Sequence, residues 1–134
     1  MVLVLKDKTN ETLINLGTEL SSSGATSIVY NVTDTNDFVC KLYRKKSYAK
    51  TIHKKLIHFE KNPPSEELAA IEVLGSTYHQ LAWPKQVVYE DDKPVGFIMP
   101  KINFDLAVPL NKIFSVKNRK SAGFVEDIRW RILV

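Results

Sequence analysis

The fold is decided by residues 16–43, LGTELSSSGATSIVYNVTDTNDFVCKLY. Two stretches rich in β-branched and aromatic residues, 28–32 and 38–43, flank a polar turn, which predicts a pair of antiparallel strands. A preceding strand is expected at 12–20, and seven residues without a large side chain, 21–27, connect it to the pair. The sequence therefore predicts a β-sheet whose first connection is a loop of small residues.

Lys41 interrupts the apolar segment 38–43. An ammonium ion buried in such a strand costs several kcal/mol unless an anion meets it. The same pattern also arises when the stem of a lysine packs in the sheet and its ammonium group reaches water at the edge. Together with the small-residue loop upstream, Lys41 is the reason to consider a phosphate site.

The loop and the lysine resemble the start of the small lobe of a protein kinase. The kinase signature is a glycine-rich loop, G-x-G-x-x-G-x-V, followed by a strand that carries the lysine of V-A-I-K. With Val29 placed on the signature valine, the three glycine positions fall on Ser22, Gly24 and Ser27. Only the middle glycine is kept. A serine still hydrogen-bonds to phosphate, but it does not adopt a positive φ cheaply.

The strand that follows matches the end of V-A-I-K with Val39, Cys40 and Lys41. The resemblance implies that the chain binds ATP. Val29 and Val39 would cover the adenine ring, Lys41 would pair with the α- and β-phosphates, and the three loop positions would line the same pocket.

A second block, AWPKQVVYEDDKPVGFIMPKI at 82–102, predicts a β-hairpin around the charged turn 90–93. It resembles the fourth and fifth strands and the hinge of a bacterial Ser/Thr protein-kinase-like family, the helix-hairpin-helix-associated one. By that resemblance Met99 is the gatekeeper, Pro100 offers its carbonyl to the adenine amino group, and Ile102 offers its N–H to the ring. An ordinary hairpin in which Met99 fills the core has the same pattern.

Two helices are predicted between the blocks, and a short edge strand is expected at 2–5. The first helix begins at Ser47 and ends before Pro63, because its apolar residues share one face. They are Tyr48, Ile52, Leu56 and Phe59. The second helix is expected from Ser65 to Gly75. Its apolar stripe would be formed by Leu68, Ile71 and Leu74.

A kinase small lobe also needs a glutamate that pairs with the strand lysine. Glu60 has a suitable spacing from Lys41, so the resemblance gives these two residues a catalytic role. Glu72 and Glu67 are the alternatives. For each of the three, a plain surface glutamate is the competing interpretation.

The other face of the first helix is basic. It carries Lys50, Lys54, Lys55 and Lys61. Such a face is typical of a solvated helix. Because no exposed aromatic residues lie between the lysines, it would bind a nucleic acid only through sequence-independent electrostatic attraction to the phosphates. Nucleic acid is therefore not the expected partner.

Composition fits one globular domain of 134 residues, with 44% hydrophobic and 25% charged residues. The net charge of +4 permits a nucleotide partner. One cysteine and no signal peptide indicate a reducing compartment, so a cytoplasmic location is expected. Neither a membrane span nor a cluster with metal-ligand spacing is recognisable.

The sequence lacks the catalytic half of a kinase. It has no H-R-D-x-x-x-x-N loop and no D-F-G, which carry the general base and the Mg²⁺ ligands. Mg²⁺ is therefore expected only in a complete parent protein, and phosphoryl transfer is not expected of this chain alone. The apolar end of the chain, 130–134, predicts either a truncated protein or a segment completed by another chain, and it favours self-association through this segment.

The predicted fold is α+β: a five-stranded antiparallel sheet with one or two packed helices, of the protein-kinase small-lobe type, plus short C-terminal helices. Residues 1–102 would form this lobe, and 103–134 would form the segment after the hinge and the truncated start of a large lobe. The expected function is that of the ATP-binding small lobe of a parent that transfers phosphate from ATP to protein Ser/Thr. The alternative is a non-catalytic interaction module that binds a protein partner through the basic helix or the C-terminal apolar segment.

Overall fold

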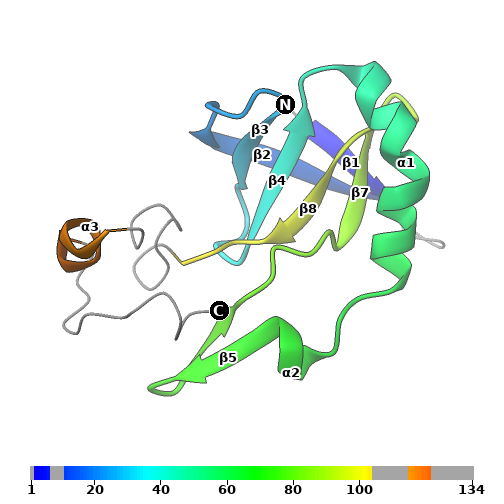
Figure 1. Ribbon diagram of the computed structural model, residues 1–134. Coiled ribbons are helices and arrows are strands. Elements are labelled where there is room, and N and C mark those ends of the chain that lie inside the picture. The colour runs from blue at the N-terminus through cyan, green and yellow to red at the C-terminus, as the bar shows by residue number, and fades with distance from the viewer. Residues whose placement is uncertain (1, 7–10, 104–114, 122–134) are drawn as a thin grey trace. The chain divides into compact units, whose positions relative to one another are not determined.

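The computed structural model describes residues 2–6, 11–103 and 115–121 (Figure 1). The chain divides into two compact units, residues 1–102 and 103–134, and each is described by itself. The first unit is built on a β-barrel with a long helix on its outside. In the second unit, the described residues include helix α3 (Val116–Ser121).

Six strands form the closed barrel, and neighbouring strands run antiparallel in the order β1-β2-β3-β4-β8-β7. Their bounds are β1 (Val2–Lys6), β2 (Glu11–Ser21), β3 (Ser27–Val32), β4 (Phe38–Tyr43), β7 (Gln86–Glu90) and β8 (Lys93–Pro100). The strands predicted at 12–20, 28–32 and 38–43 and the hairpin within 82–102 are thus confirmed.

The prediction of a five-stranded sheet of the protein-kinase small-lobe type is wrong. Strand β1, expected at an edge, pairs with β2 on one side and with β7 on the other, where Val4 lies opposite Tyr89 and Leu5 opposite Val88. An open sheet would leave the backbone groups of two edge strands unpaired, whereas closure pairs them. Leu3 contributes to closure, because its side chain is fully buried in the interior cluster.

The barrel interior holds the larger of two apolar clusters. Its buried members are Leu3, Ile14, Val32, Cys40, Val88, Val95 and Ile98. Burial raises the pKa of the Cys40 thiol to about 12. The thiol therefore stays protonated at neutral pH, and Cys40 acts as a small core residue and not as a nucleophile.

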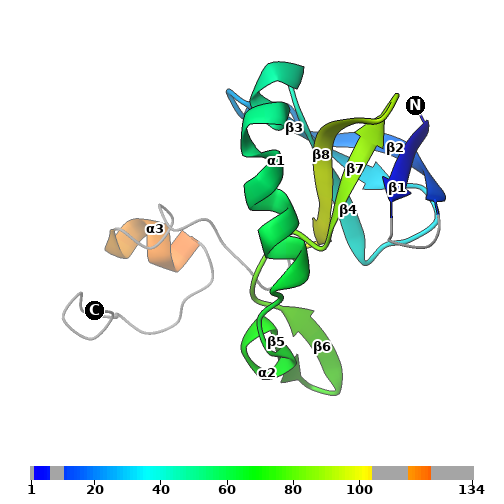
Figure 2. The same cartoon turned by 90° about the vertical axis from the view of Figure 1, so that its right-hand side faces the viewer.

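Helix α1 (Lys46–Lys61) packs on the outside of the barrel against β7 and β8 (Figure 2). Leu56 packs there with Val87 and Phe97 and forms the second apolar cluster. Ser47 does not cap the helix, because the N-cap is Lys45 and no side chain bonds to the free amides. The helix ends before Pro63, as predicted.

The predicted helix at 65–75 is mostly wrong. Only α2 (Glu66–Ala69) is helical, and the chain then forms the hairpin β5 (Ala70–Val73) and β6 (Ser76–His79). Leu74 and Gly75 make its two-residue turn with φ of 50° and 80°, a left-handed turn that suits a hairpin. The helical stripe had no surface to cover, since Leu68 is 69% exposed and Leu74 fully exposed.

The remaining C-terminal predictions are only partly testable. Most of the segment predicted to carry the short C-terminal helices, residues 104–114 and 122–134, lies outside the described residues. Residues 117–120, whose basic side chains would also suit a loop, lie in α3. The Asn118 N–H donates a hydrogen bond to the Ser115 hydroxyl oxygen at 3.1 Å. Within the described ranges, no helix is long and apolar enough to cross a membrane.

Candidate functional site

The outer face of β3, β4 and β8 brings together four of the residues predicted to contact ATP. Val29 lies opposite Lys41, and Val39 lies opposite Met99. Alternate side chains of a strand share a face, so Val39 and Lys41 point to the same side of β4. Because the intervening Cys40 lies in the barrel interior, this shared side is the outer one.

Lys41 is half-buried on this face. Its Nζ atom lies 5.9 Å from the centre of the Phe97 ring. Among the described residues, no carboxylate lies within ion-pair distance of Lys41 and none forms a hydrogen bond with its side chain. A ring face replaces only a small part of the water that a lysine loses on burial. The ammonium group therefore remains available to an anion.

Aromatic rings border Lys41 on the side of α1. The Tyr43 ring lies 6.2 Å from Phe97 and 5.1 Å from Tyr48, with the Tyr48 contact edge to face. Burial, and next the neighbouring Tyr48, raise the pKa of the Tyr43 hydroxyl. Tyr43 therefore stays neutral at physiological pH and adds no negative charge beside Lys41.

Arg44 holds the small-residue loop between β2 and β3. Its guanidinium group donates to the carbonyl oxygens of Gly24, at 3.0 Å, and of Ser22. Its backbone N–H donates to the carbonyl of Thr26 at 2.9 Å. The loop is thus tied to the end of the strand that carries Lys41. Sequence reasoning missed this role, although a cation directly after an apolar strand was the available signal.

The loop backbone does not need glycine at the two positions where serine stands. Neither Ser22 nor Ser27 has a positive φ, and neither does Gly24. The serine substitutions are therefore compatible with this loop conformation. Ser27 is buried at the start of β3, whereas Ser22 and Gly24 are exposed, so only these two loop positions are open to a ligand.

The predicted hinge lies at the opposite end of β4 from the loop. Pro100 is the last residue of β8 and lies opposite Phe38. The next residue, Lys101, donates its N–H to the carbonyl of Asp37 at 2.8 Å, and Ile102 follows without regular structure. These contacts fix the chain after β8 beside the β3–β4 turn.

The structure does not bring the predicted glutamate to Lys41. One carboxylate oxygen of Glu60 accepts a hydrogen bond from the Val87 N–H at 3.1 Å. Glu72 and Glu67 are exposed on β5 and α2. No pairing of Lys41 with any of the three occurs. Among the described residues, no cluster of His, Cys, Asp or Glu could hold a metal ion.

Fold and site together define a small antiparallel β-barrel that carries on its outer face a half-buried lysine without an ion pair to any described residue. No family model matches this chain, and no match is found among curated proteins or solved structures. The kinase resemblance of the two sequence blocks therefore stays a prediction.

Proposed function

We propose that this chain binds a nucleotide, ATP by the sequence resemblance, through its phosphate groups at Lys41. The observation that carries the proposal is that half-buried Lys41 forms no ion pair with any described residue. A phosphate oxygen would supply the missing charge, and a charge-assisted hydrogen bond of this kind is about twice as strong as a neutral one.

The surroundings of Lys41 support a nucleotide over a bare phosphate ion. Val29, Val39 and Met99 share its face. Val39 is buried and Met99 packs against the cluster of Leu56, Val87 and Phe97, so half-buried Val29 offers the apolar contact that suits a flat aromatic base. Ser22 and Gly24 at the exposed loop add small residues that let a ligand approach the backbone. On this proposal the chain binds ATP, and transfer to protein Ser/Thr belongs to a parent protein that supplies a general base and Mg²⁺ ligands.

We expect Lys41→Met to weaken ATP binding about 10- to 100-fold, because the variant loses one hydrogen bond between a charged donor and a phosphate oxygen. Isothermal titration would measure the affinity, with and without Mg²⁺, and a series from adenosine to ATP would show tighter binding with each added phosphate. Lys55→Met is the matched control, because the Lys55 Nζ atom also lies 5.9 Å from a ring, that of Phe59. Equal affinities of the Lys41 and Lys55 variants, or no binding by the wild type, would sink the proposal.

A second candidate, a protein-binding module, is favoured by the exposed hairpin. Leu74 is fully exposed, Leu68 is 69% exposed and Ile71 is 44% exposed. Ile71, one of these three residues, lines a cleft of about 750 Å³. It is lined in part by Pro64, Ala70, Leu81 and Trp83. Exposed apolar groups that gather at one place mark interaction sites.

The carboxylates that line the same cleft favour an extended partner segment that is basic and apolar. Glu66, Glu67 and Glu72 line it together with one lysine, Lys85, so carboxylates outnumber ammonium groups there. Among the described strands β5 pairs only with β6, which leaves a strand edge open for β-augmentation.

A short peptide of alternating valine and lysine should therefore shift the backbone NMR signals of 70–79. Ile71→Ser, in the cleft lining, should weaken this binding at least several-fold. Leu13→Ser, at a position 66% exposed on β2, should leave it unchanged. An alternating valine–glutamate peptide that binds equally well would rule out this charge-matched docking.

A further inference from the structure

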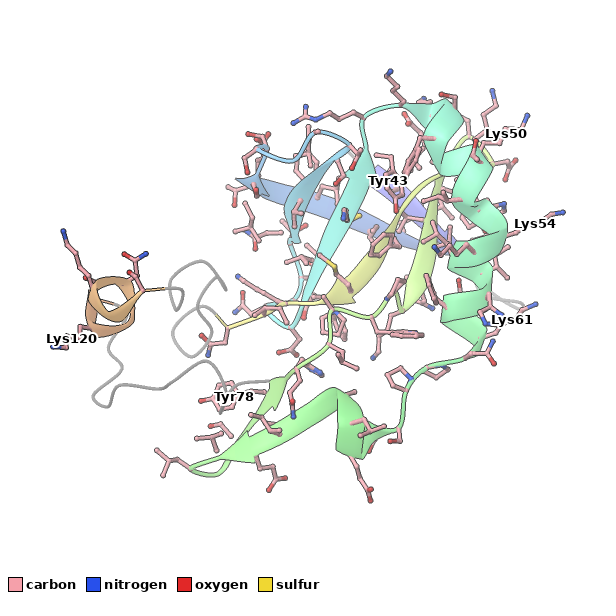
Figure 3. All side chains as sticks on the ribbon, viewed as in Figure 1. Tyr43, Lys50, Lys54, Lys61, Tyr78 and Lys120 are labelled. Atoms are coloured by element: carbon pink, nitrogen blue, oxygen red, sulfur yellow. The ribbon has the colours of Figure 1, made fainter. Side chains whose placement is uncertain are left out.

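The outward face of α1 carries a row of lysines. Lys50, Lys54 and Lys61 are all exposed, and Figure 3 shows them pointing away from the barrel. Successive helical residues turn by about 100°, so the three side chains fall within an arc of about 40°. We call these three residues the lysine row.

Negative charge that would balance the lysine row is missing from the helix. Glu60 is the one acidic residue of α1, and its carboxylate is turned inward to the Val87 N–H. Glu90, on the neighbouring β7, pairs with Lys46 at 3.1 Å. None of the three lysines of the row has an ion pair with a described residue.

Helix stability accounts for only part of this charge pattern. Cations are favourable at the C-terminal end of a helix, and Lys61 lies in the last turn of α1. Lys50 and Lys54 lie earlier in the helix and are four residues apart, a spacing at which like charges repel. These two lysines of the row therefore work against the helix on which they lie.

The rest of α1 distinguishes a nucleic acid from a membrane surface. An interfacial helix inserts its apolar face into the lipid, but that face of α1 is already used, because Leu56 is buried against Val87 and Phe97. The side that remains open is polar: Ser47, Thr51 and His58 are exposed beside the lysine row. Lysines and hydroxyl groups such as that of Ser47 are common donors to phosphate oxygens, whereas the Thr51 hydroxyl already donates to the Ser47 carbonyl at 3.0 Å.

We propose that the lysine row binds the sugar-phosphate backbone of a nucleic acid without sequence preference. At 1.5 Å per residue, the row extends over about 16 Å, and each strand of a duplex offers a phosphate every ~3.4 Å of helix axis. Each of the three ammonium groups can therefore meet a different phosphate. This surface is separate from the proposed nucleotide site, since Lys41 lies on β4.

The test is the salt dependence of binding to a fluorescein-labelled oligonucleotide, single-stranded or duplex, followed by anisotropy between ~50 and ~200 mM salt. Each phosphate contact contributes roughly 0.9 to the slope of log K against log salt for duplex DNA. The variant Lys50→Gln/Lys54→Gln/Lys61→Gln should lose about 2 to 3 from that slope and at least ten-fold in affinity at low salt. Glutamine is a good helix former, and circular dichroism would check the fold.

The control is Lys93→Gln/Lys117→Gln/Lys120→Gln, which removes the same charge from exposed positions outside α1. It should keep most of the slope. If both triple variants lost the same amount of slope, the effect would depend only on net charge, and the proposal would be overturned. So would undetectable binding by the wild type, or stronger binding to anionic lipid vesicles than to either oligonucleotide. If the triple variant is unfolded, Lys54→Gln alone should lower the slope by about 1, and an unchanged slope would contradict the proposal.

Discussion

Gly96→Ala is expected to destabilise the barrel by at least about 3 kcal/mol, or to prevent folding altogether. A Cβ atom at position 96 would overlap the carbonyl oxygen of Lys41 and lie 2.9 Å from its carbonyl carbon and 3.0 Å from the Leu42 Cα atom. All three atoms belong to the backbone of β4, so no side-chain rotation relieves the overlap. Strand β8 must move away from β4, which breaks the ladder between them.

The measurement is urea unfolding followed by circular dichroism, and the matched control is Gly17→Ala. Gly17 also lies within a strand, but a Cβ atom there would be 3.5 Å from the Asn31 Cβ atom and 3.6 Å from its carbonyl oxygen, ordinary contact distances. That variant should change the free energy of unfolding by less than about 1 kcal/mol. Equal stabilities of the two variants would show that β4 and β8 are not as close at Gly96 as described.

Gly96 also links the fold to the candidate site. Because Gly96 has no Cβ atom, the backbone of Lys41 can pack directly against it. Lys41 is also the residue that makes the proposed phosphate contact. A milder packing defect at Gly96 would therefore shift Lys41 along with β4. The sequence shows a glycine at position 96 but does not show why glycine is required there. The residue whose backbone excludes a Cβ atom, Lys41, is more than fifty residues away in the chain.

Local pattern explains which strands could be predicted from the sequence. The strands around Val29 and Val39 carry their own β-branched residues and turn signals, so their positions follow from residues close in the chain. Barrel closure depends instead on the pairing of Val4 with Tyr89, which no local signal contains. The prediction of an open sheet was wrong for this reason.

The hairpin after α2 shows where periodicity misleads. Leu68, Ile71 and Leu74 have helical spacing, but a stripe forms a helix only if a surface exists to bury it. Leu74 remains fully exposed, and Gly75 with its φ of 80° is better suited to the turn of a hairpin than to the end of a helix. The β-branched Ile71 and Val73 were the signal for a strand.

The candidate site was predictable only in part, for the same physical reason. Lys41 stands out because a cation interrupts an apolar strand, and the face that it shares with Val39 follows from their spacing. The contacts of Arg44 with the loop and of Glu60 with Val87 join distant segments. The sequence therefore could not show that Glu60 hydrogen-bonds to the Val87 N–H instead of pairing with Lys41.

The second large effect is expected from Leu3→Ala, which tests the closure of the barrel directly. The Leu3 side chain is fully buried among Ile14, Val88 and Ile98 in the interior cluster. Truncation of a buried leucine to alanine costs about 2–5 kcal/mol. The upper half of this range is expected here, since β1 is short and its neighbours are held by ladders on both sides, so the cavity has little room to collapse.

Leu13→Ala supplies the control on the adjacent strand. Leu13 lies opposite Val4 in the same β1–β2 ladder, but it is 66% exposed, so its truncation should cost less than about 0.5 kcal/mol. Urea unfolding should give both variants the same m value and a lower midpoint for Leu3→Ala alone. If Leu3→Ala proved as harmless as Leu13→Ala, β1 would contribute no core residue and the sheet would be open in solution. A large loss would instead show that the stability of the face carrying Lys41 depends on a strand that closes the barrel from its other side.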